Sequence, residues 1–241
     1  MHLNRFITYS FYFYLVFVSF SCRNNSATEI IEDEVFEEII NEKINMLSLG
    51  DSYTIGQSVC STCGFPEQLR DSLQQRHNEV EFNLKVIART GWTTRNLINA
   101  IDNEELSTNF DLVTLLIGVN NQYQKLPFST FETEFPQLIQ KAIASVNSNT
   151  SKLIVLSIPD YAFTPFGNGN TSISSEIQKY NTHIKNFCLT NNITFINITD
   201  ITQAGLENPE YVASDGLHPS KEAYTEFVKL LLPLSTQKLG L

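Results

Sequence analysis

Basic residues are scarce in this sequence. Lysine and arginine together number 16, against 26 aspartates and glutamates, which gives a formal net charge of −10. A nucleic-acid-binding domain needs a basic face, because phosphate contacts supply most of its affinity. Electrostatic adsorption to anionic lipid needs basic residues as well. The composition therefore argues against both kinds of partner, while 42% hydrophobic residues suffice to build a full core.

Several short motifs of α/β enzymes are also absent. The chain has no P-loop and no G-x-G-x-x-G, which argues against nucleotide binding. It has no H-E-x-x-H, so zinc-protease chemistry is unsupported. The G-x-S-x-G turn of α/β-hydrolases is missing too, since the nearest stretch, residues 56–60, ends in Cys60. We expect neither a metal nor a cofactor.

Cysteine is rare, with four residues in the chain. Cys60 and Cys63 have the C-x-x-C spacing, which can bind metal or carry out redox chemistry. Neither a second C-x-x-C nor a cluster of histidines accompanies this pair. In an exported protein, a local Cys60–Cys63 disulfide that tightens one loop is the favoured interpretation. Cys188 falls in a predicted helix, where we expect it to act as a small buried hydrophobic residue.

The N-terminus has the pattern of a secretory signal. Arg5 precedes an uncharged apolar stretch at residues 6–20, and the chain becomes polar directly after Cys22. A positive start, a short apolar stretch and a small residue before the cleavage point define such signals. The stretch is also shorter than the roughly 20 residues of a membrane-spanning helix. We assign residues 1–21 to a signal peptide; a buried N-terminal helix or an uncleaved anchor is the alternative.

Cys22 makes this prediction more specific. Ser21-Cys22 resembles the lipobox of bacterial lipoproteins, in which the cysteine is diacylated and becomes the mature N-terminus, although Ser19 stands where the lipobox usually has Leu. Two acyl chains suffice for stable anchoring, whereas one is marginal. The resemblance implies lipidation of Cys22 and an exported protein anchored in the bacterial cell envelope, in the periplasm or at the outer membrane. Ordinary cleavage that leaves this cysteine unmodified would give a secreted protein instead.

An acidic segment separates the signal from the remaining chain. Residues 29–42 are rich in acids and have too few apolar residues to fill a core. We expect residues 22–43 to be a solvated spacer between the lipid and the folded domain; a short amphipathic helix docked on that domain is the alternative. Residues 44–241 then suit one domain.

From residue 44 onward, short apolar runs alternate with longer amphipathic segments. Alternating or continuous apolar runs predict strands, and apolar residues at helical spacing predict helices. The predicted strands are residues 44–49, 80–88, 112–117, 153–158 and 194–198. The predicted helices are residues 65–76, 93–101, 131–146, 173–189 and 221–232. This alternation predicts a three-layer α/β/α sandwich with about five parallel strands.

Polar or glycine-containing turns follow several of the predicted strands. They are Gly50-Asp51-Ser52-Tyr53, Arg89-Thr90-Gly91-Trp92, Gly118-Val119-Asn120-Asn121 and, after the last strand and a loop, Asp215-Gly216-Leu217-His218-Pro219. Each alone is a common turn composition. Because ligands bind outside the carboxyl ends of the strands in open parallel sheets, their occurrence in order at one edge indicates a functional site.

Among the histidines, only His218 stands in a turn beside an acid. His2 leaves with the signal, His77 falls in a polar surface stretch, and His183 lies in the middle of a helix. Asp215 precedes His218 by three residues, so its carboxylate can reach the imidazole, fix the tautomer and stabilise the imidazolium. Such an imidazole can take the proton of a serine hydroxyl, which is otherwise a weak nucleophile.

Together the turns resemble the sequence blocks of the SGNH, or GDSL-type, hydrolase family, and the resemblance covers the whole predicted domain. It implies the flavodoxin-like fold of that family, with Ser52 as nucleophile and Asp215 and His218 as its catalytic partners. It also implies an oxyanion hole formed by the backbone N–H groups of Ser52 and Gly91 and the side-chain amide of Asn120. Both roles are expectations that depend on the family match.

The sequence departs from the family pattern at two positions that are not catalytic in the family. Tyr53 stands where the family has Leu, and Asn121 where it commonly has Asp. The resemblance implies a serine esterase that hydrolyses carboxylic esters through an acyl-enzyme intermediate, with small acyl or acetyl groups favoured. A lipase or lysophospholipase acting on membrane lipids is the alternative, and a non-catalytic, glycan-binding lipoprotein is a third.

Aromatic residues near these turns have two interpretations each. Tyr53 and Trp92 either shape the acyl pocket or pack in the core. Tyr161, Phe163 and Phe166, which belong to a long loop, either cover the substrate or pack over the edge of the sheet.

Overall fold

The computed structural model describes residues 42–104 and 106–241. The predicted signal peptide, Cys22 and nearly all of the predicted spacer lie outside these residues. Within the described part, no helix combines the length and apolar character needed to cross a membrane. Strand β1 begins at Glu42, so Glu42 and Lys43, which we predicted to belong to the spacer, are part of the sheet.

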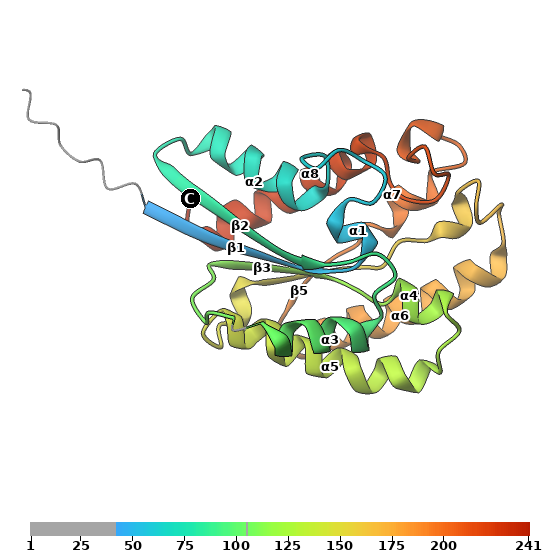
Figure 1. Cartoon of the computed structure of the whole chain (residues 1–241), viewed down its shortest axis with the longest axis horizontal. Helices are drawn as coiled ribbons and strands as arrows, with labels where there is room; N and C mark the ends of the chain where they lie inside the picture. Colours follow the sequence, from blue (N-terminus) through green and yellow to red (C-terminus); the bar gives the residue numbers. More distant parts are fainter. Residues whose placement is uncertain (1–41, 105) are drawn as a thin grey trace, which may run out of the picture. The chain divides into compact units, whose positions relative to one another are not determined.

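Five parallel strands form one sheet in the order β2-β1-β3-β4-β5. The strands are β1 (Glu42–Gly50), β2 (Val80–Ala88), β3 (Leu112–Leu116), β4 (Leu153–Leu156) and β5 (Thr194–Ile196). Helices cover both faces of the sheet (Figure 1). This arrangement confirms the predicted three-layer α/β/α sandwich with five parallel strands. The strand order reverses between β1 and β3, which is where open sheets of this type bind ligands.

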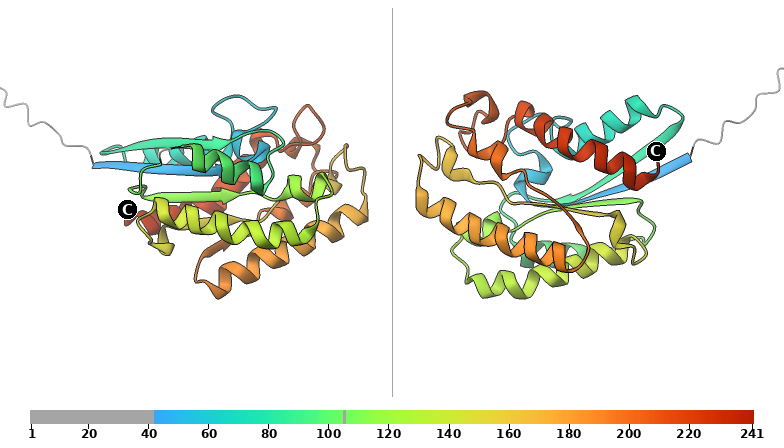
Figure 2. Two further views of the ribbon diagram at one scale, coloured as in Figure 1. Left: turned by 60° about the horizontal axis from the view of Figure 1, so that its bottom comes forward. Right: turned by 180° about the vertical axis from the view of Figure 1, so that it is seen from behind.

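Long helices form the two outer layers. They are α2 (Phe65–Arg76), α3 (Thr94–Asn103), α5 (Phe128–Ser145), α6 (Thr171–Thr190) and α8 (Lys221–Leu239). Figure 2 shows α2 and α8 on one face of the sheet and α5 and α6 on the other, where α3 packs against α5. The shorter elements are α1 (Ser52–Ile55), α4 (Val119–Tyr123), η1 (Thr150–Lys152), η2 (Tyr161–Phe163), α7 (Thr199–Gln203) and η3 (Pro209–Tyr211). Of these, α1, α4 and α7 lie at the carboxyl ends of the strands (Figure 1).

Two helices extend by three or more residues beyond one of their predicted ends. Helix α8 continues to Leu239 although Pro233 lies inside it. Ser235, in the turn beyond this proline, is fully buried, so tertiary packing holds the helix together where an interior proline removes a hydrogen bond. Helix α5 begins at Phe128, ahead of the predicted start, because the Phe128 ring packs on that of Phe131 in the same aromatic layer.

The end of β1 is packed too closely for any residue but glycine. Gly50 is paired in register with Leu116 of β3. A Cβ atom on Gly50 would clash with the Leu116 carbonyl oxygen and with Thr54 Oγ1. The close approach lets the chain turn directly from β1 into α1, so that Ser52 becomes the first residue of α1 at the carboxyl edge of the sheet.

Candidate active site

The turn between β1 and α1 is built around a buried carboxyl group. Asp51 is the N-cap of α1, where its side chain accepts a hydrogen bond of 3.0 Å from the Tyr53 N–H. Capping of this kind satisfies one of the free N–H groups at a helix start. Asp51 has no solvent exposure, and Ser52 beside it retains 3%. The cap therefore fixes the position of Ser52 at the edge of the sheet.

One cavity of about 170 Å³ gathers residues from turns that lie far apart in the sequence. Ser52, Gly91, Asn120 and His218 all line it. The remaining lining residues are Tyr53, Thr90, Val119, Tyr123, Tyr161 and Leu217. The structure thus brings the candidate nucleophile, base and oxyanion donors to a single site.

Asp215 and His218 form a close pair within one turn. Asp215 Oδ2 lies 2.6 Å from His218 Nδ1, and Oδ1 accepts hydrogen bonds from the N–H groups of Leu217 and His218 at 2.9 and 3.0 Å. Partial burial raises the pKa of Asp215, but hydrogen bonds from Ser58, His218 and Leu217 outweigh it and hold that pKa well below its usual range. An ionised Asp215 requires Nδ1–H on His218, which leaves Nε2 free to accept a proton.

The candidate nucleophile and the candidate base share a cavity without a direct hydrogen bond among the described residues. Ser52 and His218 line the same cavity, and the His218 ring packs on Tyr53 with 5.0 Å between ring centroids. Among the described residues, the side-chain hydrogen bond of His218 is to Asp215, and none joins its ring to the Ser52 hydroxyl. Catalytic hydrogen bonds are often long in the free enzyme and shorten when substrate binds.

The two candidate oxyanion donors beyond Ser52 are held from several sides. Gly91 has a φ of +79°, and the space where a Cβ atom would lie is open. Its carbonyl accepts a hydrogen bond of 2.9 Å from Gln124 Nε2, just after α4. Asn120 Nδ2 donates to the Trp92 carbonyl at 3.1 Å and more weakly to Asp51 Oδ2 at 3.4 Å. An oxyanion in the cavity would replace Asp51 Oδ2 as the acceptor of this long hydrogen bond.

Asn121, the departure from the family pattern, has a structural role. It is fully buried. Its Oδ1 accepts from the Thr94 N–H at 2.9 Å, and its Nδ2 donates to Thr94 Oγ1 at 2.7 Å. An amide can make both bonds at once, whereas a carboxylate could only accept. Asn121 therefore joins the start of α3 to α4 and fixes the turn of Gly91 relative to Asn120.

Comparison with known proteins identifies the family. Residues 48–225 match the model of the GDSL-like Lipase/Acylhydrolase family. The chain belongs to this family. It is therefore a hydrolase of the carboxylic-ester class. No curated protein sequence matches the chain.

Solved structures with the same fold include several GDSL hydrolases and other esterases. An α/β hydrolase from the metagenome of Lake Arreo, Spain, has a TM-score of 0.65 at 16% identity, covering 83% of this chain and 98% of its own. The lipase/acylhydrolase of Enterococcus faecalis has a TM-score of 0.63 at 18% identity, covering 79% and 94%. An acetylxylan esterase of Geobacillus stearothermophilus has a TM-score of 0.58 at 18% identity, covering 84% and 97%. At these identities the likeness is one of fold.

The other residues singled out from the sequence lie apart from the reacting groups. Cys60 and Cys63 form a disulfide, and Cys188 is buried with a free thiol. His183 packs among aromatic rings of α5 and α6, and His77 follows α2. Within residues 42–104 and 106–241, no group of histidine, cysteine and acidic side chains could hold a metal ion.

The aromatic residues divide between the two interpretations. Tyr53 and Tyr161 line the GDSL hydrolase's cavity. Trp92 is not among the lining residues: its side chain packs against the core, and its carbonyl accepts from Asn120. Phe166 is 52% exposed and contacts Tyr161, so it borders the site without covering it.

Replacing Asn120 by alanine should slow turnover about a hundredfold or more, because one preorganised oxyanion donor typically contributes about 2.7–4 kcal/mol to the transition state. The measurement is kcat with p-nitrophenyl acetate, together with the unfolding midpoint to show that the fold is intact. Asn186→Ala, an exposed position on α6, is the matched control and should behave like the wild type. An Asn120→Ala variant with undiminished kcat would exclude Asn120 from the site.

Asp51 should make the stability of this hydrolase fall as the pH rises from mildly acidic to neutral. Burial raises the pKa of Asp51 to about 7, although hydrogen bonds from the Tyr53 N–H and the Asn120 amide act in the opposite direction and lower this pKa. The unfolded value is about 3.9, so between these values the folded state keeps a proton that the unfolded chain releases, and stability declines with pH. The depressed pKa of Asp215 stabilises the fold throughout this window, and that contribution declines only below the unfolded value, as the pH falls toward the folded one.

Asp51→Asn should remove this dependence, because asparagine caps a helix equally well and carries no titrating group. Between about pH 5 and about pH 8, the wild type should lose on the order of a few kcal/mol more unfolding free energy than the variant. Urea unfolding at both pH values measures the difference. If the unfolding free energy changed equally with pH in the wild type and in Asp51→Asn, the pKa of Asp51 would lie near its ordinary value.

Proposed function

We propose that this GDSL hydrolase cleaves short-chain acyl esters, acetyl esters above all, through an acyl-enzyme intermediate on Ser52. The observation that carries the proposal is the cavity of about 170 Å³ that Ser52, Gly91, Asn120 and His218 line. Pockets for drug-sized ligands measure about 300–1,000 Å³, so this one suits an acyl group of few carbons.

The chemistry uses each of these residues in turn. His218 Nε2 takes the proton of the Ser52 hydroxyl as Ser52 Oγ attacks the ester carbonyl. The resulting oxyanion accepts hydrogen bonds from the N–H groups of Ser52 and Gly91 and from the Asn120 amide. His218 then gives its proton to the departing alcohol, and a water molecule activated by the same imidazole releases the acid. Asp215 stabilises the His218 imidazolium both during formation of the acyl-enzyme and during its hydrolysis.

A wider groove beside the cavity favours a second candidate, a lipase or lysophospholipase. The groove measures about 650 Å³, and Tyr123 and Tyr161 line both spaces. Its walls include apolar side chains such as Phe128 and Ile173, which suit a long acyl chain. Its walls also include Lys125, Glu176 and Lys179, and burying these charges under an acyl chain would be costly. The charges favour a substrate whose bulk is polar, such as an acetylated glycan; one of the structures with this fold is an acetylxylan esterase.

A series of p-nitrophenyl esters from acetate to palmitate separates the two candidates. We expect kcat/KM to be highest for acetate and to fall as the acyl chain lengthens. Phe166→Ala, which changes the groove but not the cavity, should leave acetate hydrolysis unchanged. Leu189→Ala, an exposed position near the C-terminal end of α6 and outside both spaces, is the matched control. If kcat/KM were highest for palmitate and Phe166→Ala abolished this preference, the lipase would be the better assignment and the esterase proposal would be wrong.

We also propose that the protein is exported and lipid-anchored at Cys22, with residues 22–41 as a spacer. The support is the sequence pattern of the N-terminus. Mass spectrometry of the mature N-terminus should find a diacylated Cys22, and Cys22→Ser should release the protein from the membrane fraction. An unmodified thiol at Cys22 would contradict the anchor and leave the esterase proposal intact.

A further inference from the structure

We propose that Ser58 is a positioning residue, whose hydroxyl group holds the Asp215 carboxylate against His218. Ser58 Oγ donates a hydrogen bond of 2.6 Å to Asp215 Oδ2, the same oxygen that lies 2.6 Å from His218 Nδ1. The inference rests on the proposed roles of Ser52, Asp215 and His218. It goes beyond them because Ser58 lies outside the sequence blocks that carry the family resemblance.

Ser58 makes the one long-range hydrogen bond to this carboxylate among the described residues. The other partners of Asp215, Leu217 and His218, belong to its own turn. Ser58 is 157 residues away in the sequence and follows α1, the helix that begins with Ser52. The bond therefore connects the turn that carries the acid and base to the element that carries the nucleophile.

The exposure of Asp215 explains why this connection matters. The Asp215 side chain is 30% exposed, whereas that of His218 is 9% exposed. Water competes for the oxygens of an exposed carboxylate, and a carboxylate that rotates no longer fixes the imidazole tautomer. A hydroxyl donor on Oδ2 keeps the carboxylate oriented toward His218 Nδ1.

The loop that carries Ser58 is closed at both ends. Ser58 has a φ of +68°, a left-handed conformation that is uncommon for residues other than glycine. Its neighbour Gln57 accepts a hydrogen bond of 2.5 Å from Thr90 Oγ1, next to Gly91. At the base of the loop, Gly56 packs so closely that a Cβ atom there would lie 3.2 Å from the Cα atom of Gly64. These contacts hold Ser58 in place although its side chain is exposed.

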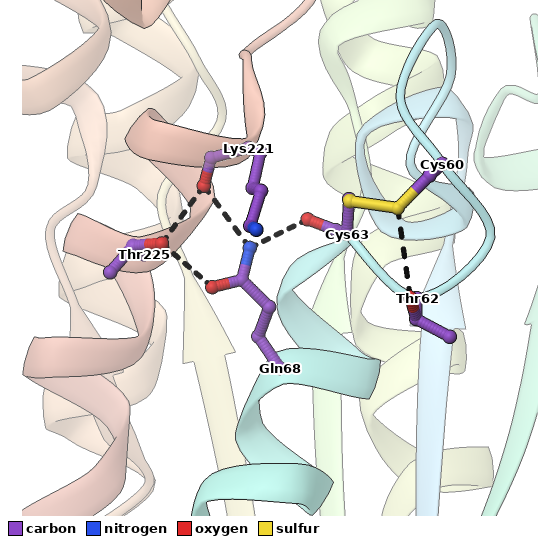
Figure 3. Close-up of a disulfide and its surroundings, with 6 residues drawn as sticks. All are labelled: Cys60, Thr62, Cys63, Gln68, Lys221 and Thr225. Atoms are coloured by element: carbon purple, nitrogen blue, oxygen red, sulfur yellow. Dashed lines mark hydrogen bonds between the residues drawn. A yellow bond between two sulfur atoms is a disulfide. The ribbon is translucent and has the colours of Figure 1, made fainter.

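A disulfide and a glutamine fasten the far side of the same loop (Figure 3). Cys60 and Cys63 are bonded to each other, and the Cys63 carbonyl accepts from Gln68 Nε2 at 2.7 Å. The Gln68 side chain also donates to the Lys221 carbonyl at 3.1 Å and accepts from Thr225 Oγ1 at 2.8 Å. Because α8 follows the His218 turn directly, the loop is fastened to the element that begins just after the base.

The shared oxygen gives Ser58 a signature in the pH dependence of catalysis. A donor on Oδ2 lowers the basicity of the carboxylate, so removing it strengthens the attraction between Asp215 and the His218 imidazolium. The acidic limb of the kcat/KM profile should then move to higher pH. The other titratable residues that line a cavity together with His218 are Tyr53, Tyr123, Asp160, Tyr161 and Tyr211. None of these contacts Ser58 through a hydrogen bond among the described residues, so their effect is the same in wild type and variant.

Ser58→Ala should lower kcat for p-nitrophenyl acetate roughly tenfold, the typical effect of one hydrogen bond to a charged group, and should shift the acidic limb upward. Ser58→Asn should recover most of the lost kcat and return the acidic limb close to its wild-type position, since asparagine tolerates the left-handed conformation and supplies an N–H donor. Ser61→Ala, an exposed serine in the same loop, is the control and should match the wild type. A Ser58→Ala variant with the wild-type kcat and the wild-type pH profile would overturn the proposal. So would a loss of kcat that leaves the acidic limb in place and that Ser58→Asn does not recover.

The disulfide supplies a second test by double-mutant cycle. Cys60→Ser/Cys63→Ser should lower kcat in the wild-type background and have little further effect in Ser58→Ala, because both changes remove the same contact. Additive losses would contradict an action of the loop through Ser58. These results are distinct from a failure of the proposed function, which would appear as full activity in Ser52→Ala whatever the Ser58 variants do.

Discussion

Ser52→Ala should reduce kcat for p-nitrophenyl acetate by about 10⁵-fold or more, down to the small residual rate that binding and the oxyanion donors give without a nucleophile. The reason is that Ser52 is the only serine among the cavity residues, and it lies at the helix start capped by Asp51. Thr90 also lines the cavity, but its hydroxyl donates to Gln57. Among the described residues that line the cavity, no second serine or free threonine hydroxyl could take over from Ser52.

Two measurements check this expectation. Steady-state kinetics should show the loss in kcat, and a fluorophosphonate probe should label the wild type on Ser52 and leave the variant unlabelled. Ser61→Ala, exposed and outside the cavity, is the matched control and should retain both activity and labelling. Residual activity within a hundredfold of the wild type in a homogeneous Ser52→Ala preparation would show that another residue attacks the ester.

The residues of the cavity could be predicted from the sequence because the fold places them by a simple rule. Ser52, Gly91 and Asn120 each follow a strand of the parallel sheet, and parallel strands all end at the same edge. His218 could be assigned because Asp215 precedes it within one turn. Local pattern and strand direction were enough for these positions.

Other features of the site depend on contacts between loops, which leave no local pattern. The partners Ser58 and Asp215 are 157 residues apart, and nothing in either segment indicates the other. The contact of Asp51 with Asn120 depends on how the start of α1 meets α4, and the pairing of Asn121 with Thr94 on how α3 meets α4. Only the departure of Asn121 from the family pattern gave a signal in the sequence, and its meaning required the structure.

The bounds of helices and strands likewise divide into those that local sequence determines and those that depend on contacts with other segments. The bounds of α2 and β2 agree with the sequence pattern, since Pro66 at the start of α2 and strict alternation in β2 are local signals. The continuation of α8 through Pro233 is not local, because it depends on the packing of residues beyond the proline, such as the buried Ser235.

Asp215→Asn should lower kcat by about 10⁴-fold, the loss found when a triad aspartate is replaced by asparagine. The asparagine Oδ1 can still accept from the N–H groups of Leu217 and His218, so the turn should keep its shape. Its Nδ2 would then face His218 Nδ1 and force that nitrogen to be an acceptor. The proton would move to Nε2, and the imidazole could no longer take the proton of Ser52.

The variant separates tautomer control from simple loss of charge. Asp215→Ala removes the charge and also the backbone acceptor, so it should destabilise the turn, whereas Asp215→Asn keeps the acceptor and should lower the unfolding midpoint less. Nitrogen-15 spectra of the His218 ring should show the proton on Nδ1 in the wild type and on Nε2 in Asp215→Asn. A kcat within tenfold of the wild type, or a ring proton that stays on Nδ1, would mean that Asp215 does not set the tautomer. Because Ser58 acts through the Asp215 carboxylate, which this variant lacks, adding Ser58→Ala to Asp215→Asn should cost little more activity.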